Sequence, residues 1–153
     1  MYKKILVPID GSATSRAALD EAARLARLSG CAIELLHVVN DLDFGTGFET
    51  PEVYLRQVRP QFMDHARKLL EDTRGQLQSQ GVAAESTLIE SEGARVSACI
   101  VNRARESRPD LIVLGTHGRR GVDRFLLGSD AEQVARLSPV PVMLVRLPQP
   151  EAA

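Results

Sequence analysis

The stretch Ile5-Leu6-Val7-Pro8-Ile9-Asp10-Gly11-Ser12 is the strongest indication of the fold. It begins with an uninterrupted apolar run, which is typical of a strand buried on both faces, and it ends in a turn. Ser12 suits the N-cap of a helix predicted over 12–29, because its hydroxyl can accept from an unpaired backbone N–H. Gly30 follows, where a left-handed residue ends helices favourably. A buried strand, a tight turn and an amphipathic helix predict the first unit of a parallel α/β sheet.

Strand and helix patterns alternate along the rest of the chain. Further strands are predicted over 32–39, 82–88, 111–114 and 141–145, and further helices over 61–77, 94–107 and 129–138. Long crossovers between strands require a parallel sheet covered on both faces. The strongest apolar runs, 5–9 and 111–114, are expected at its centre. We therefore predict a three-layer α/β/α, Rossmann-like fold with a five-stranded parallel sheet in the order 3-2-1-4-5.

The segment 40–60 is less regular than its neighbours. Its first half lacks periodicity, which predicts a loop. Pro51 suits the start of a helix, but Pro60 is expected to interrupt that helix before the regular pattern begins. We expect one domain over residues 1–147 and a frayed tail over 148–153.

Composition excludes several classes of protein. The 153 residues are 44% hydrophobic and 25% charged, which is ordinary for one globular domain. The net charge of -1 gives no electrostatic indication of a nucleic acid or membrane partner. No apolar run approaches the ~20 residues of a membrane span, and the N-terminal run is too short for a signal peptide, so we expect a cytoplasmic protein. Cys31 and Cys99 lack metal-binding spacing and are expected to be buried thiols.

The chemistry is expected in the segment Gly115-Thr116-His117-Gly118, followed after nine residues by Gly128-Ser129. The glycines let backbone approach a phosphate closely, and the free N–H groups at a helix start favour an anion. Ser129 can donate to a phosphate or cap the helix, and the charge of Arg119 lies beside the loop. Each of these residues also has a purely structural interpretation. The glycines could only form turns, and the His117 ring could only orient the loop. Asp10 lies at the predicted switch point, where a ligand role competes with a simple turn role.

The spacing resembles the ATP-binding signature of the universal stress protein family, G-x2-G-x9-G-[ST]. The resemblance extends from Tyr2 to Arg146 and includes the opening strand, the segment 36–39 and the closing region. It implies that adenine or ribose is surrounded by Pro8, Asp10 and Val38. It implies that ribose and phosphates are lined by Leu114, Gly115 and Gly118, and that the phosphates face Gly128, Ser129 and Asp130.

Asp130 departs from the family pattern, because ATP-binding relatives often carry a small or apolar residue there. A carboxylate near phosphates costs affinity unless it faces away or meets a metal ion. The expected cofactor is ATP, with Mg²⁺ or Mn²⁺ held mainly through the phosphates.

Three functions compete on the sequence alone: an ATP-binding regulatory module of the stress response, an ATP-hydrolysing enzyme, and a stress protein that acts only through protein contacts. The enzyme lacks visible machinery, since there is no G-x4-G-K-[ST] loop and no paired base and nucleophile, so at most slow hydrolysis is expected. The uncharged strand at 141–146 is expected at a sheet edge, where pairing with a second copy would form a homodimer. The resemblance also implies such dimers.

Overall fold

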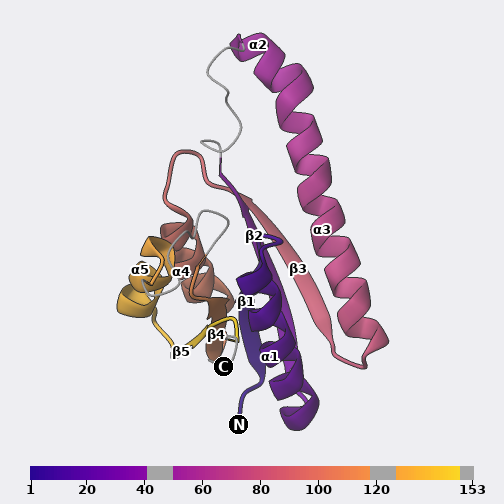
Figure 1. Cartoon of the computed structure of the whole chain (residues 1–153), viewed down its shortest axis with the longest axis vertical. Coiled ribbons are helices and arrows are strands. Elements are labelled where there is room, and N and C mark those ends of the chain that lie inside the picture. The colour runs from indigo at the N-terminus through magenta and orange to yellow at the C-terminus, as the bar shows by residue number, and fades with distance from the viewer. Residues whose placement is uncertain (41–49, 118–126, 149–153) are drawn as a thin grey trace, which may run out of the picture.

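The computed structural model describes residues 1–40, 50–117 and 127–148. Its sheet has five parallel strands in the order β3-β2-β1-β4-β5, as predicted (Figure 1). Leu6 of the central strand pairs with Glu34 on one side and with Ile112 on the other. The strands are β1 (Lys4–Pro8), β2 (Ala32–Val39), β3 (Ala84–Glu90), β4 (Leu111–Gly115) and β5 (Val142–Val145).

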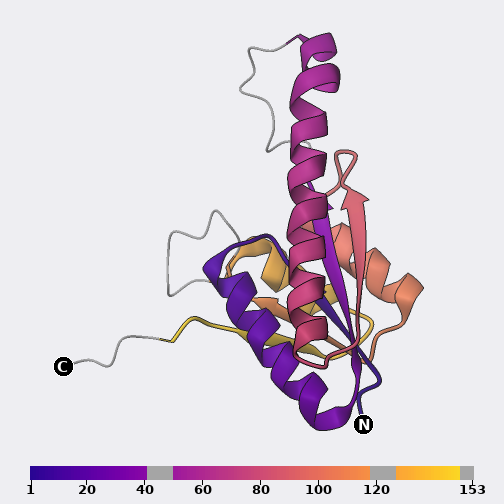
Figure 2. The same cartoon turned by 90° about the vertical axis from the view of Figure 1, so that its right-hand side faces the viewer.

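Helices cover both faces of the sheet. In Figures 1 and 2, α1 (Ala13–Ser29) and the long α3 (Arg59–Ser79) lie against one face, and α4 (Val96–Ser107) and α5 (Ser129–Leu137) lie against the other. None of the helices in the described part of the chain is long and apolar enough to cross a membrane. The result is the predicted three-layer α/β/α arrangement.

The two faces of the sheet form separate halves of the core, because successive side chains of a strand point to opposite faces. Ile5 and Val7 of β1 pack on the side of α1 and α3, whereas Leu6 packs on the side of α4 and α5. All three are fully buried. Burial on both sides explains why this strand is a continuous apolar run rather than an alternating one.

The ends of α1 follow the predicted capping chemistry. The Ser12 hydroxyl accepts a hydrogen bond from the Ser15 N–H at 3.2 Å. Gly30 takes the left-handed conformation, with φ of 72°, and its N–H donates to the Ala26 carbonyl. These caps fix where the chain leaves β1 and where it enters β2.

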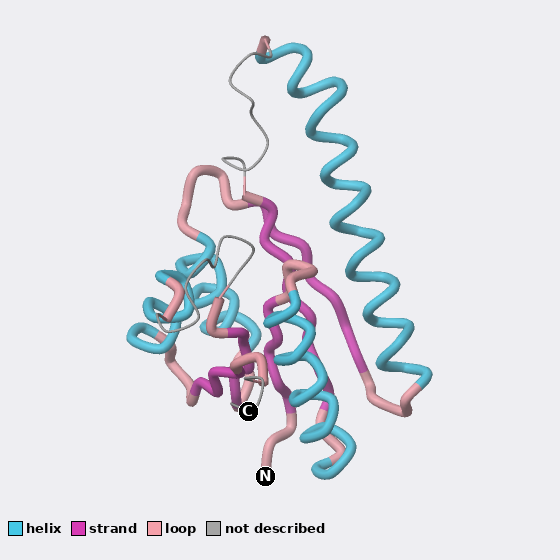
Figure 3. The backbone as a smooth tube through the Cα atoms, viewed as in Figure 1, coloured by secondary structure: helices cyan, strands magenta, loops and turns pink. Residues whose placement is uncertain are grey.

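The predicted interruption at Pro60 was wrong. Helix α2 (Pro51–Val53), the π-helical turn η2 (Tyr54–Val58) and α3 follow one another without a gap, as the tube in Figure 3 shows. The Arg59 N–H donates to the Tyr54 carbonyl, five residues back. Pro60 therefore falls in the first turn of α3, where its missing N–H and fixed φ are tolerated. The π turn before it lets the helical path continue through Pro60, which would interrupt a regular α-helix.

Strand β3 starts two residues later than predicted. The Val82 N–H donates to the Leu77 carbonyl and closes the end of α3, so this buried valine belongs to the helix end. Gly81 makes the turn with φ of 78°. Cys31 and Cys99 are buried free thiols, as expected.

A charged group is fully buried within the sheet. The Glu34 side chain is 0% exposed; its Oε2 lies 3.0 Å from the Lys4 Nζ, and its Oε1 accepts from the Arg103 Nε of α4. Burial alone would raise the pKa of Glu34, but the hydrogen bonds from Arg103 and Lys4 and the Arg103 charge outweigh it and hold the pKa below 4.5. The carboxylate therefore stays ionised and links β1, β2 and α4.

Candidate functional site

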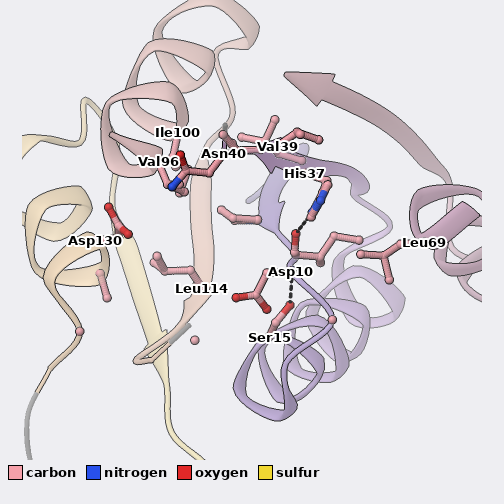
Figure 4. A pocket seen from close by; sticks show the side chains of 18 of the residues that line it. Asp10, Ser15, His37, Val39, Asn40, Leu69, Val96, Ile100, Leu114 and Asp130 are labelled. Atoms are coloured by element: carbon pink, nitrogen blue, oxygen red, sulfur yellow. Dashed lines mark hydrogen bonds between the residues drawn. The ribbon is translucent and has the colours of Figure 1, made fainter. Parts of the chain in front are cut away.

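A pocket of about 830 Å³ opens at the carboxyl ends of β1 and β4. The chain leaves β1 toward α1 on one face of the sheet and leaves β4 toward α5 on the other face. Strand order therefore reverses between β1 and β4, and this switch point is where open α/β sheets bind ligands. Figure 4 shows side chains from both strands and from the surrounding helices gathered around the opening.

One side of the pocket is built by the turn after β1. The Asp10 Oδ1 accepts from the Ser12 N–H at 2.9 Å, and the Asp10 N–H donates to the Ser15 hydroxyl at 3.1 Å (Figure 4). This Asp10 turn holds the carboxylate at the pocket wall. Asp10 thus has the turn role that the sequence left open, and its carboxylate also lines the cavity.

His37 supports the same wall from β2. Its ring is buried, and Nδ1 lies 2.6 Å from the Ile9 carbonyl oxygen, so Nδ1 donates the proton. The Ile9 N–H in turn donates to the Leu36 carbonyl at 2.8 Å. These contacts tie the end of β1 to β2 and fix the pocket floor.

The opposite side is built by the backbone that leaves β4. A side-chain carbon added at Gly115 would lie 2.8 Å from the carbonyl carbon of Thr14, so only glycine fits between β4 and α1. The Thr14 hydroxyl donates to the His117 carbonyl, and the His117 Nδ1 lies 3.0 Å from the Thr116 hydroxyl. The Gly128 N–H donates to the Thr116 carbonyl at 2.8 Å. The segments before and after residues 118–126 are therefore joined directly.

Helix α5 begins at the pocket. Its N-cap is Gly128, which offers no side-chain hydrogen bond, and its first helical bond runs from the Glu132 N–H to the Gly128 carbonyl. The N–H groups of the first helical residues, Ser129 to Ala131, therefore have no partner within the helix, which favours an anion there. Ser129 is the first helical residue rather than the N-cap, so its hydroxyl does not have the capping role that the sequence left open.

The Asp130 carboxylate lies between two helix starts. Its Oδ1 accepts from the Ser97 N–H of α4 at 3.0 Å, while its backbone belongs to the first turn of α5. The N-cap of α4, Arg95, provides no side-chain hydrogen bond. The Asp130 carboxylate of α5 caps α4 in its place. Asp130 is half-buried and lines the pocket.

Most of the predicted site residues meet around this one pocket. Gly118 and Arg119 lie outside the described residues. The predicted residues that line the pocket are Pro8, Asp10, Val38, Leu114, Gly115, His117, Gly128, Ser129 and Asp130.

Sequence reasoning missed a further part of the wall. His37 is buried and His65 is exposed, and both line the pocket. The helical spacing placed Phe62, Ala66 and Leu69 on one face, but nothing in the sequence sets where that face meets the sheet. The additional lining residues include Asn40, Phe62, Ala66, Leu69, Val96 and Ile100.

The described pocket wall is acidic rather than basic. It contains Asp10 and Asp130, and none of its described residues is a lysine or arginine. No group of three or more histidine, cysteine, aspartate or glutamate side chains in the described part of the chain could hold a metal ion by itself. A cation in this pocket would therefore need ligands supplied by a bound molecule as well as by these carboxylates.

The fold and the pocket define a class: a doubly wound α/β protein with a pocket at its switch point. Within that class, residues 1–146 match the Universal stress protein family. The chain belongs to this family.

Relatives match it over nearly the whole length. Universal stress protein YxiE of Bacillus subtilis is 34% identical over 151 residues, which cover 95% of this chain and 100% of YxiE. The solved structure of hypothetical protein MJ0577 has a TM-score of 0.83 at 27% identity and covers 98% of this chain and 99% of its own. A universal stress protein from Archaeoglobus fulgidus, solved in complex with dAMP, has a TM-score of 0.66 at 25% identity, covering 95% of this chain and 98% of its own.

Proposed function

We propose that this chain binds an adenine nucleotide, ATP with Mg²⁺ or Mn²⁺, and acts as a regulatory or signalling module in the stress response. The observation that carries the proposal is the pocket at the switch point, where the start of α5 and the glycine-containing end of β4 face the Asp10 turn. A relative that was solved with dAMP supports adenine as the base. The volume of this pocket is within the range that is typical of small-molecule sites in proteins.

The nucleoside is assigned to the side of the pocket near β1 and β2. Asp10 offers a carboxylate to ribose hydroxyls, and Pro8 and Val38 offer apolar and backbone contacts to the base and sugar. Leu114 lies between Asp10 and Asp130 in Figure 4, where it would contact the sugar. Carboxylate acceptors and apolar walls are what a ribose and a purine require.

The phosphates are assigned to the start of α5. The N–H groups of Ser129 and Asp130 and the Ser129 hydroxyl are donors there. Gly115 and Gly128 let the backbone of this end pack closely, Gly115 against Thr14 and Gly128 against the Thr116 carbonyl. Gly118, Arg119 and His117 complete this end in the proposal. The metal ion would be held mainly by phosphate oxygens, consistent with the few carboxylates at hand.

The molecule is proposed to be a binder with at most slow hydrolysis. Positioned phosphates and a metal ion can support slow cleavage without a dedicated base. The remaining alternatives are a slow ATP-hydrolysing enzyme and a stress protein that uses protein contacts only. We also propose that residues 1–147 form a single domain, that 148–153 form a tail, and that the protein is cytoplasmic.

The test uses the freshly purified full chain. Nucleotide released by denaturation is identified by mass spectrometry and quantified against protein. The proposal expects an adenine nucleotide, or its specific uptake when ATP and Mg²⁺ are added. A protein that neither carries nor takes up adenine nucleotide at millimolar concentration contradicts it and favours the protein-contact alternative.

A homodimer through the strand at 141–146 is the second part of the proposal. Strand β5 is at the edge of the sheet, and its residues Val142–Val145 carry no charge. The carbonyls of Pro141 and Val145 accept from β4, so by the alternation of a strand the amides of Val142 and Leu144 face away from β4. Pairing of these amides with the same strand of a second copy would complete the edge.

A further inference from the structure

Asp130 has little freedom to leave the pocket wall. Its Oδ1 accepts from the Ser97 N–H at 3.0 Å and thereby caps α4, a helix whose own N-cap residue provides no side-chain bond. Its backbone is fixed in the first turn of α5. A carboxylate held by two helices keeps its negative charge at one place in the pocket.

That place coincides with the end of the pocket where the proposed phosphates lie. Ser129 and Ala131, its neighbours in α5, line the same cavity, and no described lining residue is a lysine or arginine that would neutralise Asp130. Figure 4 shows Asp130 across Leu114 from Asp10, on the side of α4 and α5. The Asp130 carboxylate therefore repels each additional negative charge that a ligand brings to this end, and so opposes the attraction that the N–H groups of α5 and the proposed Arg119 provide.

From this arrangement we propose that Asp130 makes triphosphate binding depend on an accompanying divalent cation. The inference rests on the proposed nucleotide function. Metal-free ATP brings more negative charge to the start of α5 than AMP does, so Asp130 penalises ATP more. A Mg²⁺ ion on the phosphates neutralises part of that charge and can meet the Asp130 carboxylate as an additional oxygen ligand.

The test compares ATP and AMP binding to the wild-type chain and to Asp130→Asn by calorimetry, with EDTA and with Mg²⁺, at low salt. Asn keeps an oxygen acceptor for the Ser97 N–H but removes the charge. We expect metal-free ATP to bind about tenfold more tightly to Asp130→Asn, with AMP affinity changed less than about threefold. In Asp130→Asn, the gain in ATP affinity on adding Mg²⁺ should be correspondingly smaller than in the wild type.

Glu132→Gln is the matched control. It removes the same charge from the same turn of α5, but Glu132 is exposed, pairs with Arg136 and does not line the pocket. It should leave the Mg²⁺ dependence of ATP binding unchanged. An equal Mg²⁺ dependence in wild type and Asp130→Asn overturns the inference while leaving the proposed function intact. Absence of adenine nucleotide binding in every arm overturns both.

Discussion

Gly115 at the end of β4 is packed so closely against Thr14 of α1 that an added side-chain carbon would lie 2.8 Å from the Thr14 carbonyl carbon and 2.9 Å from its oxygen. The close approach lets the Thr14 hydroxyl reach the His117 carbonyl. A glycine of the sequence motif is thus required for packing, in addition to any ligand contact. The contact between Thr14 and His117 also fixes the two sides of the pocket relative to each other.

Gly115→Ala tests this packing. The clash is with backbone, which cannot move cheaply, so the free energy of unfolding should fall by about 1–3 kcal/mol. Adenine nucleotide binding should weaken as well, because the pocket wall shifts. Gly75→Ala is the control: it lies within α3, meets nothing within 4 Å, and should stabilise the protein by about 0.5–1 kcal/mol. Urea denaturation measures both; equal effects of the two substitutions would contradict the packing role.

Ser129→Ala separates ligand binding from stability. Since Gly128 is the N-cap, loss of the Ser129 hydroxyl should change the free energy of unfolding by less than about 0.5 kcal/mol. It should weaken nucleotide binding by about 0.5–1.5 kcal/mol if the hydroxyl donates to a phosphate. Ser79→Ala, at the far end of α3, should change neither quantity by a comparable amount. Calorimetric titration with unchanged affinity would remove Ser129 from the site.

Glu34→Gln tests the buried ion network. Removing one partner of a buried, charged pair should destabilise the fold by about 3 kcal/mol at neutral pH. Because the folded-state pKa of Glu34 is depressed below 4.5, its contribution is fully present above that value and is lost as pH falls through the folded-state pKa. The stability gap between wild type and variant should therefore narrow below about pH 4.5.

Exposed Glu71→Gln serves as the control for this comparison, with an expected change below about 0.5 kcal/mol. Denaturant titrations across pH 3 to 7 measure the gap at about one-unit steps. A gap that stays constant down to pH 3, about one unit or more below the ordinary carboxyl range, would show that Glu34 contributes no charge-dependent stability.

Leu144→Pro tests the proposed dimer edge. Proline removes the Leu144 N–H, which faces away from β4, so the monomer sheet keeps its own hydrogen bonds. Light scattering should show the wild type at twice the 16.7 kDa chain mass and the variant at the chain mass. Met143→Pro removes an N–H on the β4 side and should instead destabilise the fold. A wild-type monomer at micromolar concentration, or a folded Leu144→Pro dimer, would contradict the proposed interface.

Much of the fold was predictable because local and global preferences agree. The apolar run at 5–9, the Ser12 cap and the left-handed Gly30 each indicate the same strand–turn–helix unit, and the structure has it. Pro60 was misjudged because a proline rule applies to regular helices, whereas the π turn at Tyr54–Val58 shifts it into a first turn. No local sequence signal announces such a turn.

The candidate site was predictable only in part, for a similar reason. Motif residues such as Asp10 and Gly128 lie at strand and helix ends, which topology brings to one place. The wall formed by Phe62 and Leu69 depends on how far α3 extends along the sheet, which tertiary packing decides. The Asp130 bond to Ser97 joins residues of two helices, and no periodicity within either helix encodes it.

Nucleotide binding by this chain is best tested by equilibrium dialysis of the purified protein against ATP, with and without Mg²⁺. We expect saturable binding of one adenine nucleotide per chain, competed by AMP and not by a pyrimidine nucleotide of equal charge. Selectivity for the base excludes simple anion binding at a helix start. Failure to retain ATP at millimolar concentration with Mg²⁺ present, or equal retention of the pyrimidine nucleotide, would contradict it.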